Sequence, residues 1–278
     1  MKVWLDGALV DEGAARVPVS DHGLLLGDGV FETLRVYQGE PFDLDEHLAR
    51  LRGGAETMGL RAPAAPDLAR AAREVLSANE LGDARMRITV TSGPGPPGLA
   101  RGSGSPTVLV VAIPLTPWPP TSTAVVSRVR RDERSPLAGV KTTSLAESVS
   151  AFAQARAAGA DEALLLNLAG DLCEATTANV FLVRDGAAAS PPLESGCLAG
   201  ITRAHVLALG ATERPLSGAD IAQADEAFLT SSTREVQPLV AIDGQPVGSG
   251  RPGPVTSRFA QAYSAFVAGR LGRSSSGA

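Results

Sequence analysis

The chain has 278 residues and a formal net charge of −5 at pH 7, and this length is enough for two domains of moderate size. Its arginines are scattered among acidic residues, so we expect neither nucleic acid nor a membrane surface as partner, but a small molecule. Two cysteines are too few for a disulfide framework, and no cysteine and histidine cluster has the spacing of metal ligands. Because the sequence shows neither a signal peptide nor a transmembrane run, we predict a soluble, cytoplasmic protein.

The first part of the chain is predicted to form a small domain that mixes strands and helices. In chain order we expect strands at 3–5 and 30–36, helices over 44–58 and 66–79, and strands at 85–91 and 107–113. A loop rich in glycine and proline at 93–105 is too long for an ordinary turn. Four prolines within 114–120 exclude a helix and disfavour a central strand. We therefore place the first domain at 1–116 and an interdomain linker at 117–123.

A second, larger domain is expected over 124–272, followed by a disordered tail at 273–278. Its predicted elements are strands at 124–129, 163–167, 179–183 and 227–230, and helices over 146–158, 202–209 and 254–271. Both domains mix helices with strands. The fold class is therefore α/β (α+β) with two domains.

Lysine is rare in this sequence, because Lys2 and Lys141 are the only two, against twenty-three arginines. A primary amine can lose its proton when buried and attack a carbonyl to form an imine, whereas a guanidinium stays charged and cannot. Lys2 lies at the chain terminus, so Lys141 is the candidate for carbonyl chemistry. The alternative is an ordinary surface lysine, and composition alone does not separate the two.

Two segments of the second half could hold a phosphate. The run Gly200-Ile201-Thr202-Arg203 opens a predicted helix, and Thr230-Ser231-Ser232-Thr233 follows a predicted strand. The first amides of a helix lack intrahelical partners and bind phosphate, and hydroxyls can add to them. Arg50, on the same predicted helical face as His47, could supply a matching cation. Simple capping by Thr202 and a polar loop at the second segment are the alternatives.

A carboxylate at Glu174 precedes a run of small, hydroxyl-bearing and apolar residues that ends in Asn179-Val180-Phe181. A glutamate before a strand is usually solvated. If Glu174 faces a buried cofactor instead, it can keep a pyridine nitrogen protonated and make that ring an electron sink. A lysine that forms an imine, a phosphate cradle and a partner for a pyridinium nitrogen together describe pyridoxal 5′-phosphate (PLP).

Seven motifs occur in a characteristic order along nearly the whole chain. They are DHG at 21–23 continued by GDGVFETLR at 27–35, HLAR at 47–50, KTTS at 141–144, DEALLLN at 161–167, EATTANVF at 174–181, GCLAGITR at 196–203 and ADEAFLTSS at 224–232. In these motifs the chain resembles the class IV, fold-type IV PLP enzymes. That family includes branched-chain and D-amino-acid aminotransferases and 4-amino-4-deoxychorismate lyase.

The resemblance implies a smaller N-terminal and a larger C-terminal α/β domain with the cofactor between them. It also implies a homodimer in which loops such as 93–105 complete the partner's active site. Lys141 would then hold PLP as an imine and carry the proton from the alpha carbon of the substrate. Glu174 would meet the pyridine nitrogen. The other implied cofactor contacts are Arg50, Asn179, Ile201, Thr202 and Ser232.

Thr33 helps to distinguish a lyase from an aminotransferase. The resemblance places it where aminodeoxychorismate lyases carry a threonine implicated in catalysis and many branched-chain enzymes carry glycine. This position favours a lyase that releases pyruvate and p-aminobenzoate for folate biosynthesis. The alternative is a β-branched strand residue that serves packing alone.

Other positions bear on the substrate pocket. Arg87 falls where the lyases carry a lysine and branched-chain enzymes an arginine. Arg85 and Ala146 replace two tyrosines of the branched-chain enzymes. Ser92 replaces the arginine with which D-amino-acid aminotransferases bind a carboxylate.

The loop arginine of the lyases falls at Pro97, which leaves Arg101 as its substitute. The predicted substrate contacts are Phe31, Arg87, Arg101 and Thr233, and Arg85, Arg87 or Arg101 could each bind the substrate carboxylate. We therefore predict a 4-amino-4-deoxychorismate lyase. The alternative is an aminotransferase for branched-chain or aliphatic L-amino acids, D-amino acids or (R)-amines with a 2-oxo acid acceptor, and the lesser alternative is a PLP-binding protein without catalysis.

Overall fold

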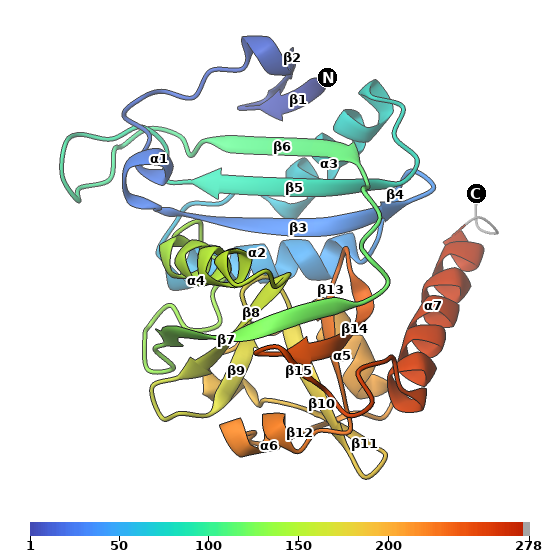
Figure 1. Cartoon of the computed structure of the whole chain (residues 1–278). Coiled ribbons are helices and arrows are strands. Elements are labelled where there is room, and N and C mark those ends of the chain that lie inside the picture. Colours follow the sequence, from blue (N-terminus) through green and yellow to red (C-terminus); the bar gives the residue numbers. More distant parts are fainter. Residues whose placement is uncertain (275–278) are drawn as a thin grey trace. The chain divides into compact units, whose positions relative to one another are not determined.

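The computed structural model describes residues 1–274, which fold into two compact units (Figure 1). The first unit contains Met1–Thr116 and Val140–Leu145. The second contains Pro117–Gly139 and the described chain from Ala146 onward. The short segment Val140–Leu145 carries Lys141, so the candidate lysine belongs to the first unit and not to the larger domain in which we predicted it.

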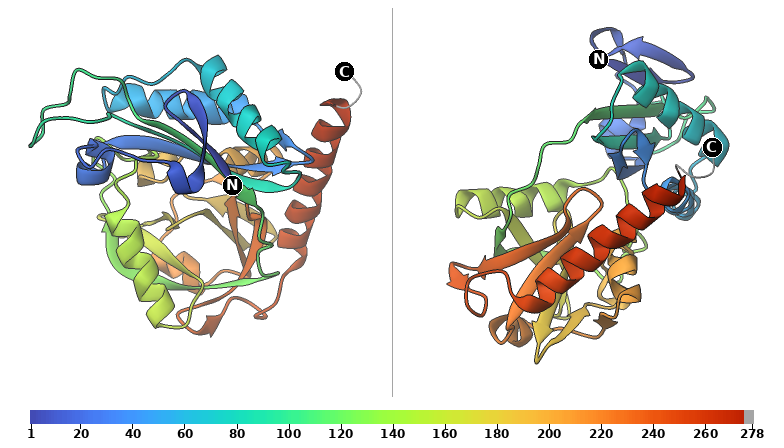
Figure 2. Two further views of the ribbon diagram at one scale, coloured as in Figure 1. Left: turned by 90° about the horizontal axis from the view of Figure 1, so that it is seen from above. Right: turned by 90° about the vertical axis from the view of Figure 1, so that its right-hand side faces the viewer.

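The first unit is built on an antiparallel six-stranded sheet in the order β2-β1-β6-β5-β3-β4. Its helices α2 (Leu44–Thr57) and α3 (Ala65–Ala78) cover one face of the sheet, as Figure 2 shows, and a short helix, α1 (His22–Leu26), precedes β3. The strands are β1 (Lys2–Leu5), β2 (Ala8–Asp11), β3 (Gly29–Tyr37), β4 (Glu40–Pro41), β5 (Ala84–Thr91) and β6 (Val108–Pro114).

Strand β3 divides its side chains between the two faces of this sheet, because successive residues of a strand point to opposite sides. Val30, Leu34 and Val36 belong to a buried core that also includes residues of α2 and α3. Phe31 and Thr33 therefore lie on the face that these helices leave uncovered. The candidate substrate residues of β3 share that face.

The segment 141–143 continues the first unit beside the beginning of β3. The backbone N–H of Phe31 donates to the carbonyl of Lys141 at 3.0 Å, and the N–H of Thr143 donates to the carbonyl of Gly29 at 2.8 Å. On this edge β3 pairs with β4 only at Val36 and Tyr37. The start of β3 therefore has backbone groups that β4 does not pair, and residues 141–143 form hydrogen bonds with them. This pairing explains why Val140–Leu145 belongs to the first unit although the chain on both sides of it belongs to the second.

Asp21, the first residue of the DHG motif, connects the two strand ends from which the 93–105 loop extends. Its buried carboxylate accepts hydrogen bonds from the hydroxyls of Thr91, at 3.0 Å, and Thr107, at 2.6 Å, which flank that loop. It also accepts the N–H of Gly23 at 2.8 Å as the cap of α1. Part of this motif therefore has a structural role.

Glu32 is a fully buried carboxylate between β3 and α2. Its two oxygens accept hydrogen bonds from Nε and Nη2 of Arg50, both at 2.7 Å, and Nδ1 of His47 lies 2.7 Å from Oε2. Burial by itself would raise the pKa of Glu32, but the hydrogen bonds from Arg50 and His47 outweigh burial and lower that pKa to about 2. The carboxylate is therefore ionised inside the core and fixes both partners on α2.

The second unit is built on a nine-stranded mixed sheet in the order β12-β11-β10-β13-β14-β7-β8-β9, with β15 paired to β14. Strand β7 is parallel to both β8 and β14, and β11 is parallel to β12. The strands are β7 (Ser122–Arg131), β8 (Glu162–Asn167), β9 (Leu172–Ala175), β10 (Asn179–Arg184), β11 (Ala187–Ser190), β12 (Thr212–Glu213), β13 (Glu226–Ser231), β14 (Glu235–Ile242) and β15 (Gln245–Pro246). Because β7 begins at Ser122, the predicted linker 117–123 is wrong: its residues belong to the second unit and partly to this strand.

Four helices complete this unit. Helix α4 (Ala146–Ala157) packs on β7 and β8, while α5 (Ile201–Ala208) and α7 (Pro254–Ser274) pack on β13, and α7 also on β14. Helix α6 (Gly218–Ala222) is a short connection. Since α7 continues through Ser274, it passes the predicted end of the domain at 272. The rest of the predicted tail, 275–278, lies outside the described residues.

Within residues 1–274, each helix is too short or too polar to cross a lipid bilayer.

Replacement of Glu32 by glutamine is expected to destabilise the apoprotein by about 3–5 kcal/mol at pH 7, because it removes the fully buried carboxylate that pairs with the half-buried Arg50. Since the pKa of Glu32 is lowered from its usual 4.5 to about 2, the stabilisation by this carboxylate is complete above about pH 4.5 and is lost as the pH falls toward 2. Urea denaturation of both proteins between pH 7 and pH 3.5, followed by circular dichroism, would measure the difference.

Glu56→Gln on the same helix is the matched control, since Glu56 is exposed and lies 3.9 Å from Arg52 in a surface pair. That change should alter the free energy of unfolding by less than about 1 kcal/mol at every pH. A difference for Glu32→Gln that stays constant down to pH 3.5 would contradict the role given to this carboxylate.

Candidate active site

Lys141 is held by its backbone while its side chain extends to Phe31. The pairing of 141–143 with β3 fixes the main chain, and the hydroxyl of Thr143 donates to the carbonyl of Gly27 at 2.8 Å. Gly29 permits this close approach, because a Cβ there would lie 3.0 Å from Oγ1 of Thr143 and 2.8 Å from the carbonyl oxygen of Val90. The Nζ atom of half-buried Lys141 lies 4.6 Å from the centre of the Phe31 ring.

Arg87 contacts the same aromatic ring. Its guanidinium carbon lies 3.6 Å from the Phe31 ring centre, and its Nε donates to the hydroxyl of Thr89 at 3.1 Å. Burial, and then the charge of Arg85, lower the pKa of Arg87. Thr33 lies directly opposite Arg87 in the β3–β5 register. The first unit therefore brings four predicted residues together, and this group offers an amine, an apolar ring, a hydroxyl and a cation that could bind a carboxylate.

Two other predicted residues of this unit have strong ion-pair partners. Arg50, predicted to bind phosphate, donates the two hydrogen bonds to Glu32 described above, and these set the orientation of its guanidinium. Arg101, predicted to bind the substrate carboxylate, donates from Nε and Nη2 to the two oxygens of Asp28, both at 2.7 Å. Arg101 also donates to the carbonyls of Met58 and Gly59 at 2.9 and 2.8 Å. It therefore anchors the 93–105 loop to its own unit.

Glu174, in the second unit, is held at both carboxylate oxygens. Oε1 accepts a hydrogen bond from Nη2 of Arg131 at 3.1 Å, and Oε2 accepts the backbone N–H of Leu198 at 3.0 Å. The side chain is only 12% exposed. An ion pair and a backbone donor both favour the charged form, so the residue has the chemistry needed to keep a pyridine nitrogen protonated.

Asn179 holds the same short segment from the other side. Its Nδ2 donates to the carbonyl of Leu198 at 2.8 Å, so Leu198 connects the two predicted residues Glu174 and Asn179. The side chain of Asn179 also leaves no room beside Gly200, where a Cβ would lie 1.9 Å from Oδ1. Only glycine fits there, and it leads directly into α5.

The beginning of α5 fits a phosphate. Gly200 is the N-cap residue, and the N-cap position therefore supplies no side-chain cap to the first amides of the helix. Thr202 is buried within the helix, so the alternative of simple capping by Thr202 is wrong. The amides of Ile201 and Thr202 are thus of the kind that binds anions in other helices.

The hydroxyl-rich run 230–233 lies at the end of β13, the strand next to β10. Thr230 is directly opposite Asn179 in the register, and α5 packs on β13. Ser232 and the buried Thr233 follow in the turn that leads to β14. The second unit therefore gathers Glu174 and the phosphate candidates of its own chain segments around the beginning of β10, whereas Arg50 belongs to the first unit; these groups match the donors and acceptors that PLP requires.

Sequence reasoning missed the arginine and glutamate partners that hold this site. Glu32, Arg131, Glu162 and Arg234 each form an ion pair with a residue far away in the sequence. Arg131 and Glu174 are 43 positions apart, and Glu162 and Arg234 are 72 apart. Glu32 lies inside a strand whose other core-facing residues are apolar. A carboxylate at such a position needs a partner, and this was the one sequence signal for any of these ion pairs.

Comparison with known proteins places the chain in a family. The model of the family described as amino-transferase class IV matches residues 29–242. The Methanocaldococcus jannaschii protein named "Putative branched-chain-amino-acid aminotransferase" is 38% identical over 95% of each chain. D-alanine aminotransferase from Bacillus licheniformis is 33% identical, over 92% of this chain and 93% of its own.

Solved structures agree with these sequence matches. The branched-chain aminotransferase of Thermoproteus uzoniensis, solved with norvaline, superposes with a TM-score of 0.90 at 35% identity, over 97% of this chain and 95% of its own. This match confirms the predicted mixed α/β, fold-type IV class. A Legionella pneumophila structure named "Putative 4-amino-4-deoxychorismate lyase" matches with a TM-score of 0.82 at 25% identity, over 90% of this chain and 94% of its own. The chain therefore belongs to the class IV aminotransferase family, whose enzymes use PLP.

Proposed function

We propose that this protein is an amino-acid aminotransferase that moves the amino group of a branched-chain or other aliphatic L-amino acid onto a 2-oxo acid. The relatives named above support this choice, since the similarity to branched-chain enzymes extends over 95% of the chain. The T. uzoniensis structure also contains norvaline, an unbranched aliphatic amino acid. We further propose that the enzyme is a cytoplasmic homodimer without a nucleic-acid partner.

The ion pair of Arg101 is the observation that favours a transaminase over the lyase that we predicted. Arg101 was the candidate to replace the loop arginine that the lyases carry, although Arg85 and Arg87 could also bind the substrate carboxylate. In the structure, four hydrogen bonds to Asp28, Met58 and Gly59 occupy this side chain. A substrate carboxylate would have to break a fork-shaped ion pair in order to bind there. The comparisons likewise support the aminotransferase alternative better than the lyase.

The D-amino-acid alternative has weaker support. A D-alanine aminotransferase matches at 33% identity, but Ser92 stands where such enzymes carry the arginine of their carboxylate trap. Arg87 remains the carboxylate contact that this site supports best, because it is partly buried beside Phe31 and Thr33.

The residues present fit PLP as the cofactor. When bound, PLP supplies an aldehyde that can react with an amine and a pyridine ring that can accept electrons from the alpha carbon. Lys141 would hold the cofactor and, as a free amine, would move the proton of that carbon. Glu174, held by Arg131, would bind the protonated pyridine nitrogen. Phosphate contacts would come from Arg50, the first amides of α5 and Ser232.

Phe31 and Arg87 would orient the substrate. Arg87 would bind its carboxylate, and the apolar ring of Phe31 would exclude water from the amine of Lys141. The burial that lowers the pKa of Arg87 also strengthens its attraction for an anion, because fewer water molecules compete. Thr33, opposite Arg87, would contact the same end of the substrate.

Lys141→Ala is expected to abolish covalent attachment of the cofactor, because the only other lysine of the chain, Lys2, lies at the N-terminus. After incubation with PLP and reduction with sodium borohydride, mass spectrometry of the wild-type peptides should find the pyridoxyl group on Lys141. The variant should carry none. Lys2→Ala is the matched control and should be labelled as the wild type is; a label on Lys2, or none on the wild type, would overturn the proposal.

Glu174→Gln is expected to lower kcat by about 100-fold, because a neutral amide cannot keep the pyridine nitrogen protonated. The Kd of PLP, measured by absorbance titration, should rise by less than about tenfold, since the phosphate contacts remain. Glu147→Gln is the control: Glu147 is the exposed second partner of Arg131, at 3.4 Å. Equal loss of kcat in both variants would show that Arg131 is important and Glu174 is not.

A substrate panel tests the proposed reaction directly. With 2-oxoglutarate as acceptor, leucine or isoleucine should react with a kcat/KM at least about tenfold above that of D-alanine, a difference of about 1.4 kcal/mol in the barrier. 4-Amino-4-deoxychorismate alone should release no pyruvate, and Lys141→Ala serves as the blank. Release of pyruvate and p-aminobenzoate without amino transfer would instead establish the lyase.

A further inference from the structure

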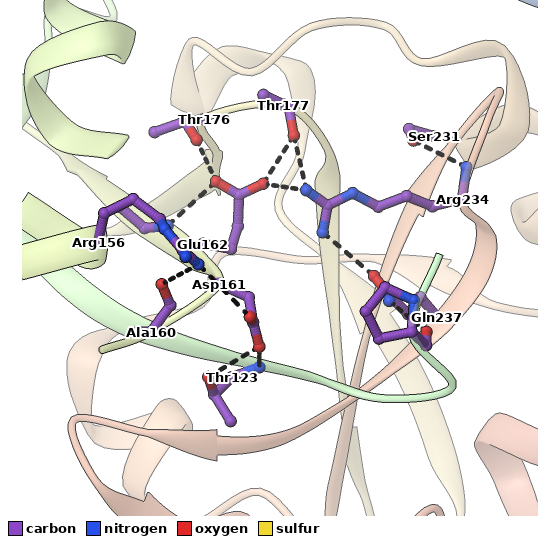
Figure 3. A network of polar contacts seen from close by, with 12 residues as sticks. Thr123, Arg156, Ala160, Asp161, Glu162, Thr176, Thr177, Ser231, Arg234 and Gln237 are labelled. Atoms are coloured by element: carbon purple, nitrogen blue, oxygen red, sulfur yellow. Dashed lines mark hydrogen bonds and ion pairs between the residues drawn. The ribbon is translucent and has the colours of Figure 1, made fainter. Parts of the chain in front are cut away.

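Glu162 is a fully buried carboxylate at the beginning of β8, and all the polar groups around it come from the second unit (Figure 3). Oε1 accepts hydrogen bonds from the hydroxyl of Thr176 and, at 3.1 Å, from the N–H of Ala163. Oε2 accepts the hydroxyl of Thr177 and Nη2 of Arg234, both at 2.7 Å. Both oxygens are therefore fully occupied.

Arg234 completes the pair from the turn between β13 and β14. It is 7% exposed, and its Nη2 also donates to the hydroxyl of Thr177 at 2.9 Å. Nη1 donates to Oε1 of Gln237 at 3.1 Å, and the guanidinium carbon lies 4.0 Å from the centre of the Trp118 ring. The side chain is thus held in one orientation by contacts on several sides.

The pair connects two turns, of which the first lies between two residues of the proposed cofactor site and the second contains such residues. Thr176 and Thr177 form the turn between β9 and β10, which lies between Glu174 and Asn179. The backbone N–H of Arg234 donates to the hydroxyl of Ser231 at 3.3 Å, which closes the turn that contains Ser232 and Thr233. Glu162 therefore bonds directly to the first turn and, through Arg234, to the second.

Stability alone does not account for such a pair. Ions lose their hydration when they are buried, and apolar residues of similar volume often give an equally stable or more stable core. What apolar side chains cannot supply is direction: the carboxylate and the guanidinium have fixed planes, and their hydrogen bonds set the distance and angle between the segments that they join.

We propose that Glu162 and Arg234 are positioning residues of the cofactor site. They keep the hydroxyls of the 231–234 turn, which would bind the phosphate, at a fixed distance from Glu174, which would bind the pyridine nitrogen. This inference rests on the proposed function, because it needs those turns to hold PLP. It adds two residues that do not contact the cofactor but determine whether both of its ends can bind at once.

The test compares PLP with pyridoxal, which lacks the phosphate. Arg234→Met and Glu162→Gln should each raise the Kd of PLP by about tenfold, because the turn with Ser232 loses its anchor. The Kd of pyridoxal should change by less than about twofold, since the contacts of Lys141 and Glu174 remain. Both constants are measured by absorbance titration, well below the Tm of each apoprotein.

The double variant Glu162→Gln with Arg234→Met separates positioning from stability. Because it leaves no unpaired buried charge, it should regain most of the Tm that the single variants lose. It should nevertheless bind PLP about tenfold more weakly than the wild type, since the two turns remain unconnected. Arg214→Met, which breaks the surface pair with Asp220 at 2.9 Å in the same unit, is the control and should change neither constant.

Two results would overturn the proposal. If the wild type prefers PLP over pyridoxal and all three variants keep that preference, the pair has only a structural role and the proposed function is unaffected. If the wild type binds neither compound, both the positioning role and the proposed function are wrong.

Discussion

The backbone pairing of 141–143 with the beginning of β3 is the interaction that places Lys141, the residue that we propose to hold the cofactor, in the first unit. Two main-chain hydrogen bonds join the residues around Lys141 to Gly29 and Phe31. Because these bonds involve the backbone, they fix the main chain of Lys141 independently of its long side chain. The same pairing places the amine over Phe31, whose ring also contacts Arg87.

Both units contain carboxylates that arginines hold in place. Glu32 with Arg50, Glu174 with Arg131, and Glu162 with Arg234 each join segments that are distant in the sequence. The planar guanidinium suits this task, because its donors have fixed directions. In these three pairs arginine sets the geometry, whereas Lys141 is the residue that we propose for the amine chemistry.

Several parts of the structure could be predicted because their signals are local. The predicted helix at 66–79 runs from Ala65 to Ala78, since its apolar residues recur at helical spacing. Strand β2 was missed, because it is a short and largely exposed edge strand without a regular alternation. The place of Lys141 in the first unit was also missed, since it depends on which strand edge lacks a partner, and that is a property of the assembled sheet.

The sequence by itself determined the kind of chemistry: a single internal lysine, a glutamate in a small-residue run and two candidate segments for anion binding indicate PLP, because these side-chain types and helix starts carry that information locally. Tertiary structure decided how they are held. Leu198 connects Glu174 to Asn179, and Asp28 forms an ion pair with Arg101, one of the three arginines predicted to bind the substrate carboxylate. Such contacts join residues tens of positions apart, and only the packed sheets bring their donors and acceptors within hydrogen-bond distance.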